Sequence, residues 1–261
     1  MAFFVRNTTN QISRQVRENI ALCLTDLEPA EQKRIYRETI RHTCYAMTEL
    51  GAVWCWPVDK ILRRVTSVDI CEEFEHSTRG KIILAPHLGS WETLGLWLGK
   101  TCDAMILYKR RKNKDHDRFI NQSRARSGGT PIPTKKHGLR KLLIGLKEGR
   151  NLLILPDQKP YGSKARIESD FFGVDAPTTT LVQNLSCKVD CDMFLATIYR
   201  SSPPGEFGLR IQPLEHEQLA TDQASSAQYM NDQIEHLVRQ FPEQYQWGYR
   251  RFSNNAYASV K

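Results

Sequence analysis

Two ionisable side chains, His87 and Glu92, stand five residues apart in the segment LAPHLGSWETLG (84–95). His87 follows the apolar run KIILAP, which predicts a buried strand, and Gly89 allows a tight turn after it. Ser90 suits the start of a helix, and the first turn of that helix favours the carboxylate of Glu92. A carboxylate against one ring nitrogen fixes the tautomer of a histidine and raises the basicity of the other nitrogen. The spacing therefore suits a general base, His87 assisted by Glu92, that acts on a hydroxyl.

A structural interpretation of this segment stays open, because H-x-x-x-x-E also fits a capped helix preceded by a structural histidine. Ser90 does not lie in a G-x-S-x-G motif, so a capping role explains it better than nucleophilic catalysis does. The zinc motifs H-E-x-x-H and H-x-E…P-C-x-x-C are absent. Cys187 and Cys191 are separated by three residues, which matches neither redox nor ordinary zinc spacing. The sequence predicts no metal and no cofactor.

The elements that must position this segment alternate between helices and strands. Helical periodicity runs from Gln11 to about Arg64, a further helix is expected from Ser90 to about Lys100, and a basic helical region ends near Gly149. The expected strands and the last helix follow from the same periodicities: strands at 81–86, 103–108, 151–156, 192–200 and 207–214, and a helix at about 221–240.

This alternation predicts an α/β fold, a mixed β-sheet flanked by helices with a helical section in front of it. We expect one domain over residues 1–261, in which 1–64 form the helical section and 65–261 the α/β part. The segment SSPPGE (201–206) is too short for a domain boundary and is typical of a hairpin loop.

Charge narrows the choice of partners. The net charge of +8 favours polyanions, and residues 109–150 hold fourteen Lys or Arg against three acidic residues. This region is either a solvated basic face or a docking surface for phosphorylated lipid, anionic headgroups or an acidic carrier protein. Only Phe119 interrupts the basic run, so the stacking aromatics of a nucleic-acid surface are scarce.

The sequence also indicates a compartment. Seven scattered cysteines suggest reduced thiols in the cytosol. The start MAFFVRN is not a signal peptide, and no stretch reaches the roughly 20 apolar residues that span a bilayer. If this protein meets a membrane, we expect it to lie on the surface.

Five segments in order along the chain extend the interpretation of His87. LAPHLGSWE, LYKRRKN, GLRKLLIGLKEGRNLLILPDQ, ESDFFGVDAPTTTLV and PEQYQWGYRRF together resemble the late acyltransferases of lipid A biosynthesis in Gram-negative bacteria, within the glycerolipid acyltransferase-like superfamily. The resemblance runs from about residue 12 to 253. It implies that His87 deprotonates an acceptor hydroxyl, while Glu92 orients His87 and stabilises its imidazolium. The hydroxyl would attack a thioester, and no covalent acyl-enzyme is needed.

The resemblance also implies substrate-binding residues. Asp157 and Gln158, in LPDQ, match a family motif, although an aspartate there could also cap a turn. Lys109 stands where the family commonly has an arginine; a lysine lacks the bidentate fork, so Arg110 is an alternative clamp for a lipid phosphate. Arg126, in the same basic region, is a further candidate.

Two positions near the C-terminus match the last family motif. Trp247 corresponds to the family's tryptophan and Arg251 to its basic position, and packing alone would also explain the tryptophan.

The resemblance also leads to an expectation about membrane contact. The chain begins roughly where the segment after the family's usual N-terminal membrane-spanning helix would start. We therefore expect peripheral attachment at the cytoplasmic face of the inner membrane, through the apolar MAFFV end, the basic surface and WCWP (54–57). Trp54 and Trp56 suit an interfacial position, though core packing explains them equally well.

The function implied is transfer of a fatty acyl chain to a hydroxyl of a lipid A precursor or related glycolipid. The donor would be acyl carrier protein or acyl-CoA, and the partners a glycolipid or phospholipid acceptor and an anionic membrane surface, without nucleic acid. Two alternatives stay open: a lysophospholipid or other glycolipid acyltransferase of the same fold, and a non-catalytic lipid-binding protein.

Overall fold

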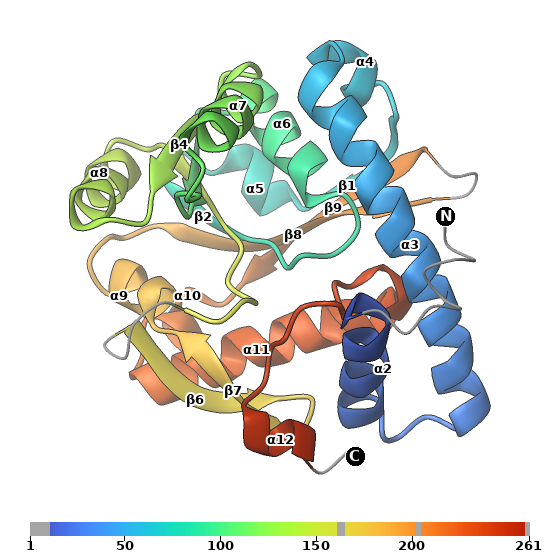
Figure 1. The fold of residues 1–261 in the computed structure, drawn as a ribbon. Coiled ribbons are helices and arrows are strands. Elements are labelled where there is room, and N and C mark those ends of the chain that lie inside the picture. The colour runs from blue at the N-terminus through green and yellow to red at the C-terminus, as the bar shows by residue number, and fades with distance from the viewer. Residues whose placement is uncertain (1–10, 161–164, 202–204, 259–261) are drawn as a thin grey trace.

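A seven-stranded sheet forms the centre of the computed structural model, which describes residues 11–160, 165–201 and 205–258 (Figure 1). Neighbouring strands run parallel except for the antiparallel pair β8 and β9. From one edge to the other the order is β1 (Val65–Ile70), β9 (Phe207–Leu214), β8 (Asp192–Arg200), β2 (Lys81–Leu84), β5 (Asn151–Ile154), β3 (Ala104–Tyr108) and β4 (Thr130–Pro133). This mixed sheet confirms the predicted α/β class.

The predicted N-terminal helical section is confirmed. It consists of α2 (Gln11–Cys23), α3 (Pro29–Cys55) and the short α4 (Val58–Leu62). Pro29 occupies the first turn of α3, where its missing N–H has no intrahelical partner in any case. The remaining helices are α5 (Glu72–His76), α6 (Trp91–Thr101), α7 (Lys114–Ala125), α8 (Lys136–Lys147), α9 (Leu181–Ser186), α10 (His216–Leu219), α11 (Gln223–Gln240), the 3₁₀ turn η2 (Pro242–Gln244) and α12 (Asn254–Ala258).

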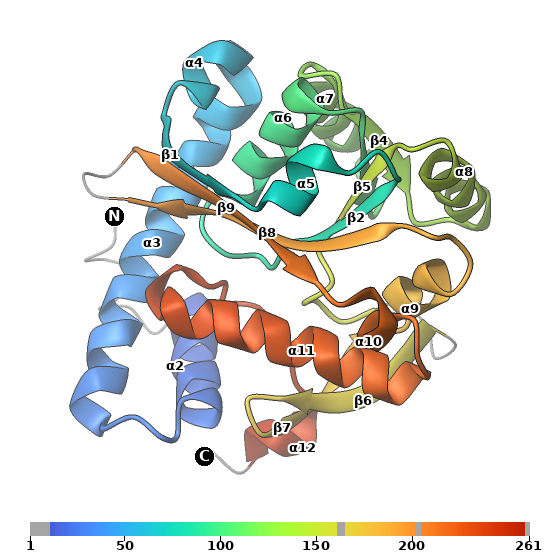
Figure 2. The same cartoon turned by 180° about the vertical axis from the view of Figure 1, so that it is seen from behind.

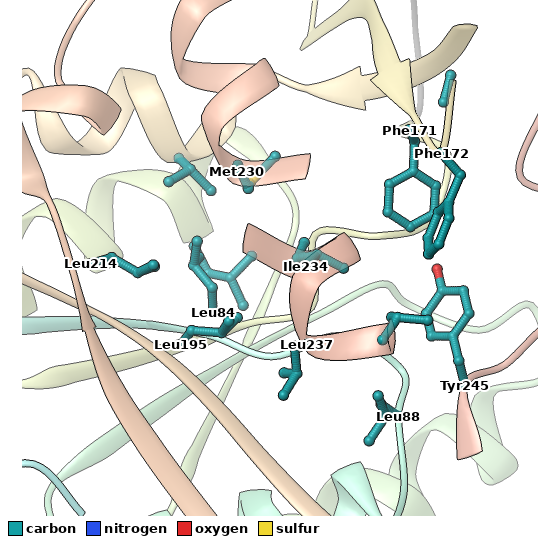
Figure 3. Packing of buried hydrophobic residues seen from close by; sticks show 14 of the residues in the cluster. Leu84, Leu88, Phe171, Phe172, Leu195, Leu214, Met230, Ile234, Leu237 and Tyr245 are labelled. Atoms are coloured by element: carbon teal, nitrogen blue, oxygen red, sulfur yellow. The ribbon is translucent and has the colours of Figure 1, made fainter. Parts of the chain in front are cut away.

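Helices cover both faces of the sheet, as the two opposite views show (Figures 1 and 2). Along β2, Ile82 and Leu84 enter the core shared with α2, α3, α8 and α11, whereas Ile83 enters the core shared with α5 and α6. Figure 3 shows the first of these cores, where Ile234 and Leu237 of α11 pack near Leu84. Burial on both faces explains why Ile82, Ile83 and Leu84 form a continuous apolar run rather than alternating with polar residues.

Three parts of the fold are not evident from periodicity. The edge strand β1 is mostly exposed, and the opposite edge strand β4 contains two prolines, so neither has a clear apolar pattern. The third part is a two-stranded hairpin, β6 (Arg166–Phe171) and β7 (Val174–Thr179), outside the main sheet. Its turn residues Phe172 and Gly173 have φ of 57° and 75°, the left-handed values that a two-residue hairpin turn needs.

Other expectations have mixed outcomes. The hairpin predicted around 201–206 joins β8 to β9, and its residues 202–204 lie outside the described residues. The apolar MAFFV end also lies outside the described residues. The single-domain organisation stays a prediction. No helix within the described ranges is both long and apolar enough to cross a bilayer.

Candidate active site

The register of two parallel strands brings His87 beside Asp157. Leu84 of β2 pairs with Ile154 of β5. His87 lies three positions after Leu84, and Asp157 lies three positions after Ile154. Ala85–Pro86 and Leu155–Pro156 separate them from the strands, and proline ends both strands because it has no N–H to donate. The two side chains therefore emerge together at the carboxyl edge of the sheet, where functional groups of open α/β sheets gather.

Asp157 contacts two nitrogen atoms of His87, one in the ring and one in the backbone. The Nδ1 of His87 lies 2.7 Å from Oδ1 of Asp157, and the backbone N–H of His87 donates to Oδ2 at 2.9 Å. Burial alone would raise the pKa of Asp157, but the charge and the two hydrogen bonds of His87 outweigh burial and hold that pKa below its usual value. An ionised carboxylate only accepts, so Nδ1 carries the proton and Nε2 keeps a lone pair when the ring is neutral.

Glu92 does not hold the ring of His87, which corrects the sequence-based expectation. Its carboxylate instead accepts from Arg124 of α7, from Nε at 3.0 Å and from Nη2 at 2.5 Å. Burial would lower the pKa of Arg124, but the hydrogen bonds and charge of Glu92 raise it, so Arg124 stays cationic. Glu92 does lie in the first turn of α6, as predicted, with only 8% of its side chain exposed. Its orientation is set by α7 and not by the histidine.

The turn that carries His87 is fixed through its backbone. Gly89 has φ of 61°, as the predicted tight turn requires, and a Cβ there would clash with the carbonyl of Ile198 in β8. The turn also pairs with the C-terminal segment: Gln246 N–H donates to His87 O at 3.0 Å, and Gly89 N–H donates to Gln244 O at 3.1 Å. Ser90 occupies the N-cap position of α6, but its hydroxyl bonds to Thr93 Oγ1 rather than to the backbone.

A cavity of about 780 Å³ adjoins these residues. His87, Glu92 and Arg124 line one part of it, and the basic segment 109–112, between β3 and α7, lines its rim. Apolar side chains from α6, β3, α7, α8 and β5 also line it: Trp91, Ile106, Ile120, Leu139 and Leu153, with Gly95 among them. Such a cavity can hold an apolar chain beside a polar reacting group and an anionic group at the rim.

The structure brings most of the predicted substrate-binding residues to this cavity. Lys109, Arg110 and Gln158 line it, and Gln158 donates to the side chain of Gln246 at 3.0 Å. Asp157 lies behind His87, with 3% of its side chain exposed. It therefore contacts the histidine and not the cavity. Arg126 is not among the described lining residues: its guanidinium bonds to the carbonyls of Val53 and Trp56, at the end of α3.

Trp247 and Arg251 serve packing in this structure. The Trp247 ring is buried against Phe172 and Tyr245, and its Nε1 donates to the carbonyl of Pro242 at 2.7 Å. Arg251 is buried and donates to Pro177 O and to Thr178 Oγ1, in β7 of the hairpin. Both residues connect the C-terminal segment to the β6–β7 hairpin.

Two functional features were not predicted from the sequence: the pairing of Asp157 with His87 and the position of Arg124. One signal for the first is the similarity of IILAPH and LLILPD, two buried strands that each end in proline followed by an ionisable residue. Arg124 sits among many basic residues of 109–150, and nothing in its local pattern sets it apart. Only the packing of α7 against α6 selects it.

The fold and the site define an α/β protein whose histidine–aspartate pair borders a cavity with an apolar lining and a basic rim. The model of the bacterial lipid A biosynthesis acyltransferase family matches residues 1–254. The chain is 30% identical over 239 residues to the lipid A biosynthesis palmitoleoyltransferase of Escherichia coli K12, covering 90% of this chain and 77% of that protein.

Two further relatives are more distant. The lipid A biosynthesis lauroyltransferase of Escherichia coli K12 is 23% identical over 240 residues, covering 91% of this chain and 78% of that protein. A lipid A biosynthesis acyltransferase of Haemophilus influenzae is 23% identical over 235 residues, covering 88% and 72%. The chain therefore belongs to the bacterial lipid A biosynthesis acyltransferase family, and it is an acyltransferase.

Proposed function

We propose that this protein transfers a fatty acyl chain from a thioester donor to a hydroxyl of a lipid A precursor, with His87 as the general base. The observation that carries the proposal is the pairing of His87 Nδ1 with Asp157 on the wall of the cavity. The names of the relatives support the acceptor class. The basic residues at the rim suit phosphates on the acceptor and the acidic surface of an acyl carrier protein, which we take as the donor.

In the reaction, Nε2 of His87 takes the proton of the acceptor hydroxyl as its oxygen attacks the thioester carbonyl carbon. The new carbon–oxygen bond forms, the carbon–sulfur bond breaks, and the departing thiolate takes the proton from the imidazolium. Asp157 keeps Nδ1 protonated and stabilises the transient positive charge of the ring. An alcohol is a poor nucleophile at neutral pH, and base assistance of this kind is worth about 10²–10⁴-fold in rate.

Glu92 and Arg124 have a different role in this proposal. They form a partly buried ion pair on the cavity wall next to Trp91, whose ring centroid lies 5.2 Å from that of His87. We assign the pair to positioning the reacting groups against His87, because a fixed carboxylate can accept from an acceptor hydroxyl while Arg124 balances its charge. The protein would work as a peripheral protein at the cytoplasmic face of the inner membrane, where a lipid acceptor is found.

The test uses purified protein with acyl carrier protein and CoA thioesters and with glycolipid and lysophospholipid acceptors, and mass spectrometry identifies the products. His87→Ala should reduce transfer several hundredfold or more, in line with the loss of a general base. His76→Ala, which removes an exposed histidine of α5 outside the cavity, should leave transfer unchanged. Near-normal turnover by His87→Ala would refute the mechanism, and products formed only from lysophospholipid would refute the acceptor.

A further inference from the structure

Exposed apolar side chains gather where α3 ends against α7. Trp56 is 37% exposed at the end of α3, Phe119 is 44% exposed on α7, and Met47 is 51% exposed two turns earlier on α3. Met47, Gly51 and Trp54 recur at helical spacing, so they share one side of α3. Trp54 joins the two helices, because its ring meets that of Phe119 edge-on, with centroids 6.2 Å apart. Met47, Trp54, Trp56 and Phe119 are called the aromatic edge below.

The aromatic edge is held in place by polar contacts beneath it. Arg126 of the α7 end donates to the carbonyls of Val53 and Trp56, and Ser123 Oγ donates to the carbonyl of Trp54 at 3.1 Å. These bonds satisfy the last carbonyls of α3, which have no partner within the helix. The end of α3 is therefore fixed against α7, and Arg126 holds the exposed aromatic rings in place through these bonds.

Cations surround the aromatic edge. Lys60 Nζ lies 4.0 Å from the centroid of the Trp56 ring, and Arg64 Cζ lies 5.3 Å from it. Residues 109–126, which include α7, carry eight Lys or Arg and two Asp. Aromatic rings interleaved with Lys and Arg are the combination that binds the headgroup region of an anionic membrane.

The aromatic edge lies beside the mouth of the cavity. One side of α7 lines the cavity through Ile120, Asn121 and Arg124, while Phe119 and His116 face Trp54. In Figure 1 the end of α3 lies with α4, α6 and α7 on the same side of the sheet. The basic segment 109–112 both precedes α7 and forms the cavity rim. A membrane that touches the aromatic edge would therefore also meet the rim.

We propose that the aromatic edge, with Lys60, Arg64 and the basic side of α7, is the docking surface for an anionic lipid bilayer. The proposal deepens the proposed function and rests on the peripheral location given there. A second copy of this chain is a poorer occupant, because the centres of protein interfaces are depleted in lysine. The basic surface alone would suit an acidic carrier protein, but the exposed tryptophan and phenylalanine add apolar contact that a bilayer satisfies.

The test measures sedimentation of the protein with vesicles of phosphatidylglycerol and phosphatidylcholine. Trp56→Ser combined with Phe119→Ser should weaken binding at least about tenfold, because both substitutions remove apolar surface that the bilayer would bury. The matched control is Val68→Ser with Ile144→Ser, which removes two exposed apolar side chains elsewhere and should change binding less than about twofold. Brominated lipids should quench wild-type tryptophan fluorescence more than that of Trp56→Phe.

Turnover on detergent-dispersed acceptor separates docking from catalysis, because the substituted residues lie outside the cavity. The Trp56→Ser, Phe119→Ser variant should retain it, so lost vesicle binding with intact turnover supports the docking surface. Equal loss of binding in both double variants, or equal quenching of Trp56→Phe and wild type, would overturn it. So would a wild-type dimer that the Phe119→Ser substitution dissociates, or a loss of carrier-protein binding with vesicle binding unchanged.

Discussion

In the proposed mechanism His87 and Asp157 act as a pair, because an imidazole that is a base at one nitrogen needs a fixed acceptor at the other. The 2.7 Å contact at Nδ1 and the second bond from the His87 backbone leave the carboxylate little freedom. The same carboxylate lies next to Tyr245, whose pKa is raised well above its usual value by burial and by the charge of Asp157. Tyr245 therefore stays neutral, and in the proposed mechanism His87 alone exchanges a proton with substrate.

A double-mutant cycle should separate the two carboxylates. Asp157→Asn should reduce acyl transfer by about 10²–10⁴-fold and add little to His87→Ala, since residues that act as a unit are not additive. Glu92→Gln should also reduce transfer, but its effect should combine with that of His87→Ala, because Glu92 bonds to Arg124 instead. Rates of acyl transfer for wild type, the three single variants and the two double variants measure this. A cycle in which Glu92 rather than Asp157 is redundant with His87 would reassign the partner.

The lowered pKa of Asp157 also has a consequence for stability. Because its pKa in the folded protein is below the unfolded value of about 3.8, ionised Asp157 stabilises the folded state above that pH, and the stabilisation is lost as pH falls through the folded pKa. The difference in unfolding free energy between wild type and Asp157→Asn should be largest near neutral pH and shrink below about pH 3.8. Urea titrations measure it, with Asp115→Asn, an exposed α7 residue, as the control. A difference that grows in acid would contradict the assignment.

At the scale of elements, β2 and β5 matter most, because their pairing creates the site. The sequence predicts each as a buried strand, and it predicts β8 and β9 with their observed bounds. In the sheet β5 lies between β2 and β3, even though β3 comes before β5 in the chain. The sequence does not predict this order. Strand order depends on long-range packing that no local pattern contains. The sequence therefore indicates His87, and local turn geometry together with the family resemblance favours Glu92 as its partner, whereas the residue that contacts the ring comes from another strand.

Helix α6 contributes Gly95 to the cavity wall. A Cβ at this position would lie 3.6 Å from Ile106 Cδ1 and 3.9 Å from Leu153 Cδ2, so alanine fits at ordinary contact while a larger side chain must extend into the cavity. Gly95→Leu should shorten the longest acyl chain that is transferred efficiently and keep turnover of shorter donors. Each excluded methylene costs about 0.8 kcal/mol, or roughly a fourfold change in preference.

A series of acyl thioesters of increasing length measures this shift, and Gly95→Ala is the matched control with little expected effect. An equal loss for every chain length in Gly95→Leu would show that this part of the cavity does not hold the acyl chain.

At the scale of the whole molecule, the two cores share the same strands. Leu152 and Ile154 of β5 belong to one core and Leu153 to the other, and Ile20 and Ile35 of the helical section enter the first. A third, smaller cluster packs Val53 and Ile61 of the helical section against Leu96 of α6. The single domain remains a prediction. We expect one cooperative unfolding transition, with coincident midpoints by far-ultraviolet circular dichroism and by tryptophan fluorescence. Two separated transitions would indicate that residues 11–64 unfold independently.

The C-terminal segment has a consequence for how the enzyme is made. Its residues Gln244 and Gln246 bond to the backbone of the His87 turn, and Tyr245 pairs with Leu88. During translation the turn leaves the ribosome long before these partners have been synthesised. A nascent chain that ends before residue 244 already contains every described side chain of the cavity wall, but it lacks these backbone partners of the His87 turn. The turn that carries His87 therefore acquires its full set of backbone partners only after residues 244–246 have been synthesised.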